Sequence, residues 1–227
     1  MSELRLLSWN VRSLRDGRAG VATVIREAGV DVALIQEAPR LARWRSKRAA
    51  LAREAGMIVG TADRVGGLVV LTSMRSWVLG HDHRTLPRLG GRHRRAVVAA
   101  CVSVAGEPAW RVAVTHLGLH PAERLEHARQ VNAGVLNPEP SEPVVLAADV
   151  NDVPESGAWR SLSEGLIDAL GAAGAGDPTY PAAAPRRRID AVFVSPGVQV
   201  VQARVLDLLR TDPPSDHLPL FVRLRRP

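Results

Sequence analysis

The sequence has very little cysteine and lysine. A single cysteine, Cys101, lies inside an apolar run, which excludes an internal disulfide and predicts a packed strand thiol in a cytosolic protein. Lys47 is the only lysine, so arginine carries almost all of the positive charge. The chain also lacks long apolar runs, and its first residues have no apolar stretch behind them. We therefore expect neither a signal peptide nor a membrane span, and a cytoplasmic location.

The charge balance is basic but is a weak guide to the partner. The chain has 30 Lys and Arg against 23 Asp and Glu, a formal net charge of +7. A basic surface attracts polyanions such as nucleic acid. An arginine excess beside abundant Ala, Gly and Val is also typical of a GC-rich genome. The charge alone therefore favours nucleic acid only slightly.

Length and composition predict a single domain over 1–227. With 46% hydrophobic residues the chain can build a core, and no linker or internal repeat is visible. Helices are expected at 20–28, 39–55 and 121–136, and strands at 5–9, 32–36, 57–60, 67–72, 77–80, 96–104, 111–115, 144–147, 189–194, 198–206 and 218–224. Loops rich in Gly, Ala and Pro are expected at 137–143 and 171–185. This mixture predicts an α+β fold with two packed, mainly antiparallel β-sheets flanked by helices.

Polar residues with metal-binding or acid–base chemistry stand at the ends of six short apolar runs. Because strand ends are where sites are built, these side chains are expected to share one pocket. A carboxylate-rich pocket with imidazoles suits a hard divalent cation and a phosphate. The residues are Asn10, Glu37, His116, Asp149 with Asn151, Asp190, and Asp216 with His217.

Each of these motifs also has an ordinary interpretation. Glu37, which precedes Pro39, is equally typical of a helix N terminus. The 149–154 segment is an obvious turn signal. Most histidines are structural or solvated, and His81, His83, His93, His120 and His127 have no motif behind them and are expected at the surface.

In this order and spacing, the six segments resemble the endonuclease/exonuclease/phosphatase superfamily. The resemblance covers the chain from Leu4 to Leu224, and six weak motifs in sequence are together a strong signal. It implies a four-layer α/β-sandwich with the site at one end of the two sheets. It also implies a metal-dependent hydrolase of phosphate esters.

The resemblance further implies a Mg²⁺ or Mn²⁺ cofactor and an activated water. Glu37 is the expected principal metal ligand, supported by Asn10 and Asp216. Asp149 would orient or deprotonate the attacking water, and Asn151 would contact a phosphate oxygen. Members usually have Gly-Asp-Phe-Asn or Gly-Asp-Met-Asn here, whereas this chain has Ala-Asp-Val-Asn.

On the phosphate side, the resemblance places His217 on the scissile phosphate with Asp190 orienting its ring. His116 would bind phosphate or protonate the leaving group, although the Glu that supports this His in deoxyribonucleases is not found in the expected region, 63–67. Arg95 would touch substrate or else lie in a solvated basic loop.

The substrate is less well defined than the chemistry. Basic residues at 83–95 and 40–53 favour a nuclease, endonuclease or exonuclease, acting on DNA or RNA. The match to the abasic-endonuclease branch is poor, because Ala-Pro follows Glu37 and His116 stands where that branch has Tyr. The alternatives are a phosphatase or a lipid or sugar-phosphate phosphodiesterase and, less favoured, a non-catalytic binding module. The sequence leaves the oligomeric state open.

Overall fold

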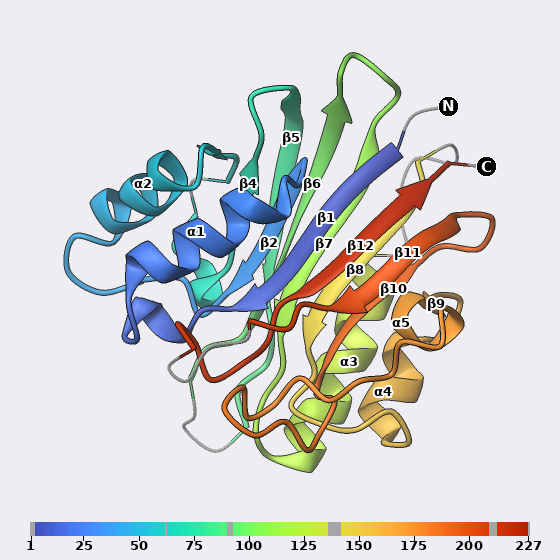
Figure 1. Cartoon of the computed structure of the whole chain (residues 1–227). Helices are drawn as coiled ribbons and strands as arrows, with labels where there is room; N and C mark the ends of the chain where they lie inside the picture. The colour runs from blue at the N-terminus through green and yellow to red at the C-terminus, as the bar shows by residue number, and fades with distance from the viewer. Residues whose placement is uncertain (1–2, 62, 90–92, 136–141, 209–212, 227) are drawn as a thin grey trace.

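The computed structural model describes residues 3–61, 63–89, 93–135, 142–208 and 213–226, and it contains two six-stranded sheets (Figure 1). The first sheet, in the order β11-β12-β1-β2-β4-β3, holds β1 (Glu3–Asn10), β2 (Val32–Gln36), β3 (Ile58–Val59), β4 (Val69–Thr72), β11 (Gln199–Val205) and β12 (Leu220–Arg225). The second, in the order β5-β6-β7-β8-β10-β9, holds β5 (Ser76–Thr85), β6 (Ala96–Val104), β7 (Trp110–His116), β8 (Val144–Asp149), β9 (Ile167–Asp168) and β10 (Asp190–Val194). Neighbouring strands are antiparallel except for the β1–β2 and β7–β8 pairs.

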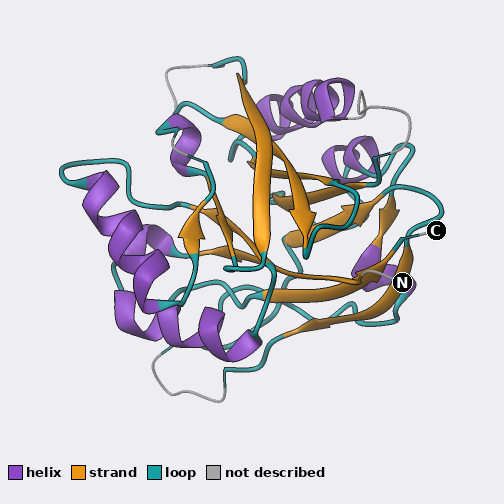
Figure 2. Cartoon of the chain, turned by 90° about the horizontal axis from the view of Figure 1, so that it is seen from above, coloured by secondary structure: helices purple, strands orange, loops and turns teal. Residues whose placement is uncertain are grey.

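Helices cover the outer faces of both sheets (Figure 2). α1 (Arg18–Ala28) and α2 (Trp44–Glu54) pack on the first sheet. α3 (Pro121–Val135) and α4 (Gly157–Leu162) pack on the second, and α5 (Ala169–Ala172) is a single turn beside β10. Two 3₁₀ turns, η1 (Arg12–Leu14) and η2 (Val65–Gly67), complete the set. The expected four-layer sandwich is confirmed.

The alternation of side chains along β1 shows how the layers are built. Leu4 and Leu6 lie in the core between the two sheets, whereas Leu7 and Trp9 pack under α1 and α2. Successive side chains of a strand point to opposite faces, so a strand buried on both faces is a continuous apolar run. This is why the central strands were visible in the sequence.

Three local expectations differ from the structure. The helix expected at 39–55 begins only at Trp44, because Arg43 adopts a left-handed conformation (φ +56°). The strand expected at 77–80 is the longer β5, whose exposed polar residues carry no apolar signal. α4, α5 and β9 were not anticipated. The end expected for α3, at Leu136, lies outside the described residues. So do most of the 137–143 loop and Arg92, which belongs to the basic 83–95 segment.

The two parallel pairs bring predicted site residues to one end of the sandwich. β1 and β2 run in the same direction in one sheet, and β7 and β8 do so in the other. β10 begins beside the end of β8 because the two strands are antiparallel.

Among the described helices, none is both long and apolar enough to cross a membrane.

Candidate active site

Residues that are far apart in the sequence meet at the strand ends. Asn10 is the last residue of β1, and Glu37 directly follows the parallel neighbour β2. In the second sheet Asp149 lies opposite His116 on one side and opposite Asp190 on the other. The Asn10 amide group donates a hydrogen bond of 2.8 Å to Asp149 Oδ2 and so joins the two sheets.

A cavity of about 330 Å³ opens between these strand ends. Its lining includes seven of the nine predicted site residues: Asn10, Glu37, Arg95, His116, Asp149, Asn151 and His217. Asp190 lies behind His217, to which it is hydrogen-bonded. Asp216 lines an adjoining hollow of about 430 Å³, which shares Asn151 and His217 with the cavity. The predicted residues are therefore gathered at one end of the molecule.

Asp149 is the centre of the site. Its carboxylate is almost fully buried, and besides Asn10 it accepts a hydrogen bond from the Asn151 backbone N–H (3.1 Å). Nε2 of His116 lies 3.2 Å from Oδ2, and Nε2 of His217 lies 4.0 Å from the same oxygen. Four groups from four segments thus fix the orientation of one carboxylate.

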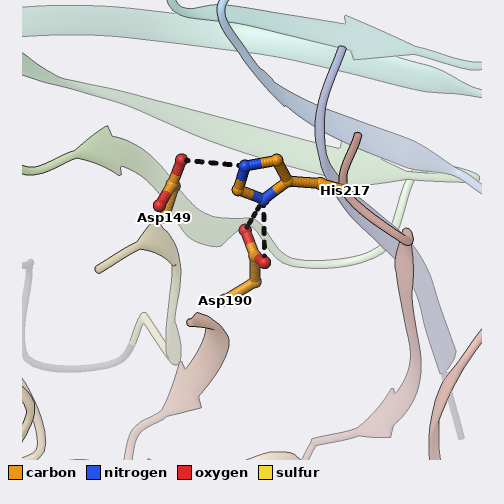
Figure 3. Close-up of side chains that lie close together, drawn as sticks. All are labelled: Asp149, Asp190 and His217. Atoms are coloured by element: carbon orange, nitrogen blue, oxygen red, sulfur yellow. Dashed lines mark hydrogen bonds and ion pairs between the residues drawn. The ribbon is translucent and has the colours of Figure 1, made fainter. Parts of the chain in front are cut away.

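His217 and Asp190 form a buried pair (Figure 3). Nδ1 of His217 lies 3.0 and 3.1 Å from the two carboxylate oxygens, and Thr179 donates a hydrogen bond of 2.6 Å to Asp190. Burial lowers the pKa of His217, but the charges of Asp190 and Asp149 and the hydrogen bond to Asp190 outweigh it and raise the pKa to about 10. His217 is therefore an imidazolium at neutral pH, with its second N–H directed towards Asp149 and the cavity.

His116, in contrast to His217, is uncharged at neutral pH. Complete burial, together with the nearby positive charges of Arg95 and His217, lowers its pKa to about 3 against the attraction of Asp149. In the tautomer that carries its proton on Nε2, the nitrogen that faces Asp149, the neutral imidazole has a lone pair on Nδ1. That Nδ1 is buried without a hydrogen-bond partner, and it lies 3.9 Å from Glu37 Oε1.

The neutral state of His116 has a measurable consequence for stability. Its folded-state pKa lies below the unfolded value near 6.5, so its stabilisation is complete above about pH 6.5 and declines as the pH falls towards 3. The unfolding free energy should fall by up to about 1.4 kcal/mol per pH unit from this one proton. His116→Gln should remove that part of the slope in urea denaturation between pH 6.5 and 4.5. His120→Gln, at an exposed histidine, is the control, and a His116→Gln curve parallel to wild type would contradict the assignment.

Two places in the site could hold a cation. The ligand-type atoms of Asp149, Asp190 and His217 all lie within 4.8 Å of one another. The other place is Glu37, whose half-exposed carboxylate faces the unpartnered Nδ1 of His116 and accepts no hydrogen bond from the described residues. A hard carboxylate ligand at an open cavity leaves room for the waters that Mg²⁺ retains. The donor set at Glu37 therefore fits a hydrated divalent cation.

The two other predicted ligands are engaged with a neighbouring turn. Oδ1 of Asn10 accepts the Arg12 backbone N–H at 3.0 Å, while its Nδ2 is bound to Asp149. Asp216 pairs with the Arg12 side chain at 3.4 Å. Both residues border the site, and both have protein partners of their own.

Backbone strain is concentrated around this cavity. Seven non-glycine residues of the described chain have positive φ, and five of them adjoin the site: Arg12, Ser13, Leu14, Glu37 and Asn151. Such conformations cost energy and persist where the surroundings over-determine them, as at functional sites. Ser13 also donates its backbone N–H to the Glu37 carbonyl (2.8 Å), which ties the strained turn to Glu37.

An arginine-rich groove of about 1060 Å³ adjoins the cavity. Its lining contains Arg40, Arg64, Arg88, Arg94 and Arg95, with Glu123 as the one acidic residue among the described lining. Arg95 lines both the groove and the cavity, where Asp149 and Glu37 attract its charge. Of the basic residues expected over 40–53, Arg40 lines the groove.

The sequence missed three contributors to the site and misplaced one histidine. Thr179 holds Asp190, Tyr180 lies with its ring centre 5.0 Å from that of His217, and the Trp9 indole N–H bonds the His217 carbonyl. The polar Thr-Tyr pair in a loop of small residues was the available signal. His127 was expected at the surface but is buried, because the Gly118 backbone N–H and the Pro87 carbonyl both bond its ring.

Comparisons with known proteins bear on the family and the fold of the chain. A family model described as "Endonuclease/Exonuclease/phosphatase family" matches residues 7–217. An endonuclease/exonuclease/phosphatase from Bacteroides vulgatus matches with a TM-score of 0.82 and 19% identity over 100% of both chains. A mannosyl-6-phosphatase from Bacteroides thetaiotaomicron gives 0.80 and 21% identity, covering 98% of this chain and 99% of that one. TDP2 from D. rerio, complexed with a single-strand DNA product, gives 0.78 and 20%, covering 99% and 100%. No curated protein matches the sequence.

Proposed function

Because the chain belongs to the Endonuclease/Exonuclease/phosphatase family, we propose that it is a divalent-metal-dependent hydrolase of phosphodiester bonds in nucleic acid. The position of the cavity supports this proposal. It lies between Glu37 and His217, has Asp149 at its centre, and opens into the arginine-rich groove. A negatively charged polymer could lie in the groove with one phosphate in the cavity.

The cation, Mg²⁺ or Mn²⁺, is assigned to Glu37 in preference to the buried Asp149–Asp190–His217 cluster. An imidazolium has no lone pair for a metal, and His217 is protonated at neutral pH. A bound cation would supply Lewis-acid stabilisation of phosphoryl oxygens. Asn10 and Asp216 border this place and, given their bonds to the 12–14 turn, would act through waters or by holding Asp149 and the turn.

The chain's own residues divide the remaining work. Asp149 orients the attacking water and accepts its proton. Asn151 donates one amide hydrogen to the Leu117 carbonyl (3.1 Å) and has the second for a phosphate oxygen at the same rim. His217, held by Asp190, neutralises charge that develops on the phosphate. His116 is neutral, so its proposed role is to hold Asp149 rather than to act as the acid.

The groove favours a nucleic acid over a small ester. Five arginines against one acidic residue give a surface that suits several phosphates at once. Its described lining has no Phe, Tyr or Trp on which bases could stack, and His93 is its one ring side chain, so we expect contacts mainly to the backbone with little sequence preference.

A sugar-phosphate phosphatase is the second candidate. The adjoining hollow of about 430 Å³ is lined by Asn151, Asp216, Arg187 and Tyr180, polar groups that suit hydroxyls. The likeness to the Bacteroides mannosyl-6-phosphatase adds to this candidate. The hollow is on the His217 side of the site and shares only Leu119 with the described lining of the arginine-rich groove, so the two candidates use largely different surfaces.

A substrate panel with a groove variant tests the proposal. Wild type should cleave plasmid DNA or RNA and bis(p-nitrophenyl) phosphate with Mg²⁺ or Mn²⁺, and EDTA should abolish both activities. Arg88→Gln/Arg94→Gln should raise KM for nucleic acid about tenfold and reduce the salt slope by about 2, with the small ester unaffected. Arg53→Gln, at an exposed arginine of α2 outside the groove lining, is the matched control. Turnover of phosphate monoesters alone would favour the second candidate.

A further inference from the structure

A second cluster of metal-binding side chains lies away from the active site. Asp63 Oδ2 is 3.3 Å from Nε2 of His81 and 3.4 Å from Nδ1 of His83. The oxygen is buried and has no hydrogen-bond partner, although the Asp63 side chain as a whole is 27% exposed. The two imidazoles are 36% and 39% exposed, so they can turn and remain accessible to an ion.

The strand geometry favours convergence of the two histidines. His81 and His83 are two residues apart on β5, where they pair with Ala100 and Val98 of β6. Side chains at i and i+2 of a strand lie on the same face. Both side chains are exposed, so this face of the edge strand β5 is open beside Asp63.

Two of the three donor–donor distances match those between ligands of a tetrahedral ion. With donor atoms at about 2.0–2.1 Å from the metal, neighbouring donors lie about 3.3–3.4 Å apart. Both oxygen–nitrogen separations have this value. The two imidazole nitrogens are farther apart, because the ligand atoms of these three groups do not all lie within 4.8 Å of one another. Both imidazoles are exposed, so rotation about their side-chain bonds has to bring the two nitrogens together at one ion.

We propose that Asp63, His81 and His83 form a site for a borderline transition metal, with Zn²⁺ the best fit. Two imidazoles and one carboxylate suit zinc, whereas Mg²⁺ prefers oxygen ligands. Arg48 is the positive charge that opposes a cation here, but it donates to the Asp63 backbone carbonyl (2.6 Å) rather than to the carboxylate. Asp63 therefore keeps its carboxylate available.

The position of the site gives it a role in bracing the arginine-rich groove. Asp63 directly precedes Arg64, Val65 and Gly66, which line the groove, and β5 ends at Thr85, which lines it too. A metal ion shared by the 63–67 segment and β5 would tie two parts of the groove wall together. The site does not depend on the proposed activity.

Zinc binding by the untagged full chain tests this proposal directly. Wild type should bind one more Zn²⁺ equivalent in equilibrium dialysis than His81→Ala/His83→Ala, and Co²⁺ should give visible tetrahedral absorption that the variant lacks. Zinc at ten times its dissociation constant should raise Tm by about 3–5 °C in wild type and not in the variant. Zinc that binds at the active site is common to both proteins and cancels.

Two further variants make the outcome decisive. Asp63→Asn should lose the same zinc equivalent, and His120→Ala, at an exposed histidine outside the cluster, should keep it. The metal-free Tm and circular dichroism of each variant establish that it is folded. Equal zinc equivalents in wild type, His81→Ala/His83→Ala and Asp63→Asn would overturn the proposal. Variants that change only the pH dependence of Tm and still bind the same number of zinc ions would overturn it too.

Discussion

Replacing Asp149 by Asn should lower kcat for bis(p-nitrophenyl) phosphate by about 10³-fold with KM little changed. The carboxylate is the proposed acceptor of the water proton, and an amide of the same shape cannot take that proton. It is also the acceptor shared by Asn10 and the Asn151 backbone, with His116 close by. Steady-state kinetics under saturating Mg²⁺ and Mn²⁺ measure the loss.

The same substitution should have a modest effect on stability. Asn keeps one carbonyl oxygen, so it can accept from either Asn10 or the Asn151 backbone but not from both with the same geometry. Loss of one buried hydrogen-bond partner costs about 1–3 kcal/mol. Asp82→Asn, at an exposed residue paired with Arg111, is the matched control. Wild-type kcat in a folded Asp149→Asn protein would remove Asp149 from the chemistry.

The central strands made the site residues visible in the sequence. β2, β8 and β10 are buried on both faces, so each is an apolar run, and the polar residue at its end stands out. Once the strands pair, their register decides which ends meet. The fold could therefore be predicted from the order of strands and helices, and the family from the resemblance carried by all six segments; both predictions are confirmed.

Exposed elements could not be predicted in the same way. β5 reads His-Asp-His-Arg over residues 81–84 and has no apolar alternation, because these side chains are exposed and only its backbone pairs with β6. Burial of His127 likewise depends on a loop 40 residues away, whose Pro87 carbonyl lies 2.7 Å from the ring.

The partners within the site also had no sequence signal. Asn10 and Asp216 were expected on the metal, yet both contact the left-handed turn at 12–14, which contains no glycine. Their assignment as ligands stays a prediction. The charge states of His116 and His217 differ although both rings lie near Asp149, because Asp190 pairs only with His217.

Asp190→Asn should convert the activity into one that requires low pH. In wild type the pKa of His217 is about 10, so the imidazolium is present throughout neutral pH. Without the Asp190 charge, burial lowers the pKa of His217 with less opposition, and the ring should become neutral near or below pH 7. We expect kcat about 10²–10³-fold below wild type at pH 8, with partial recovery at pH 6.

The proton on His217 should also stabilise the folded protein, and this contribution to the unfolding free energy should decrease as the pH rises. A folded-state pKa of about 10, above the unfolded value near 6.5, makes the His217 contribution complete below pH 6.5 and lost as the pH rises towards 10. The unfolding free energy of His217→Gln should therefore approach that of wild type as the pH rises. The same variant should lose kcat at every pH, because Gln carries no charge.

For Asp190→Asn, the control is again Asp82→Asn. Identical pH profiles for wild type and Asp190→Asn would show that the charge of His217 is not used in catalysis.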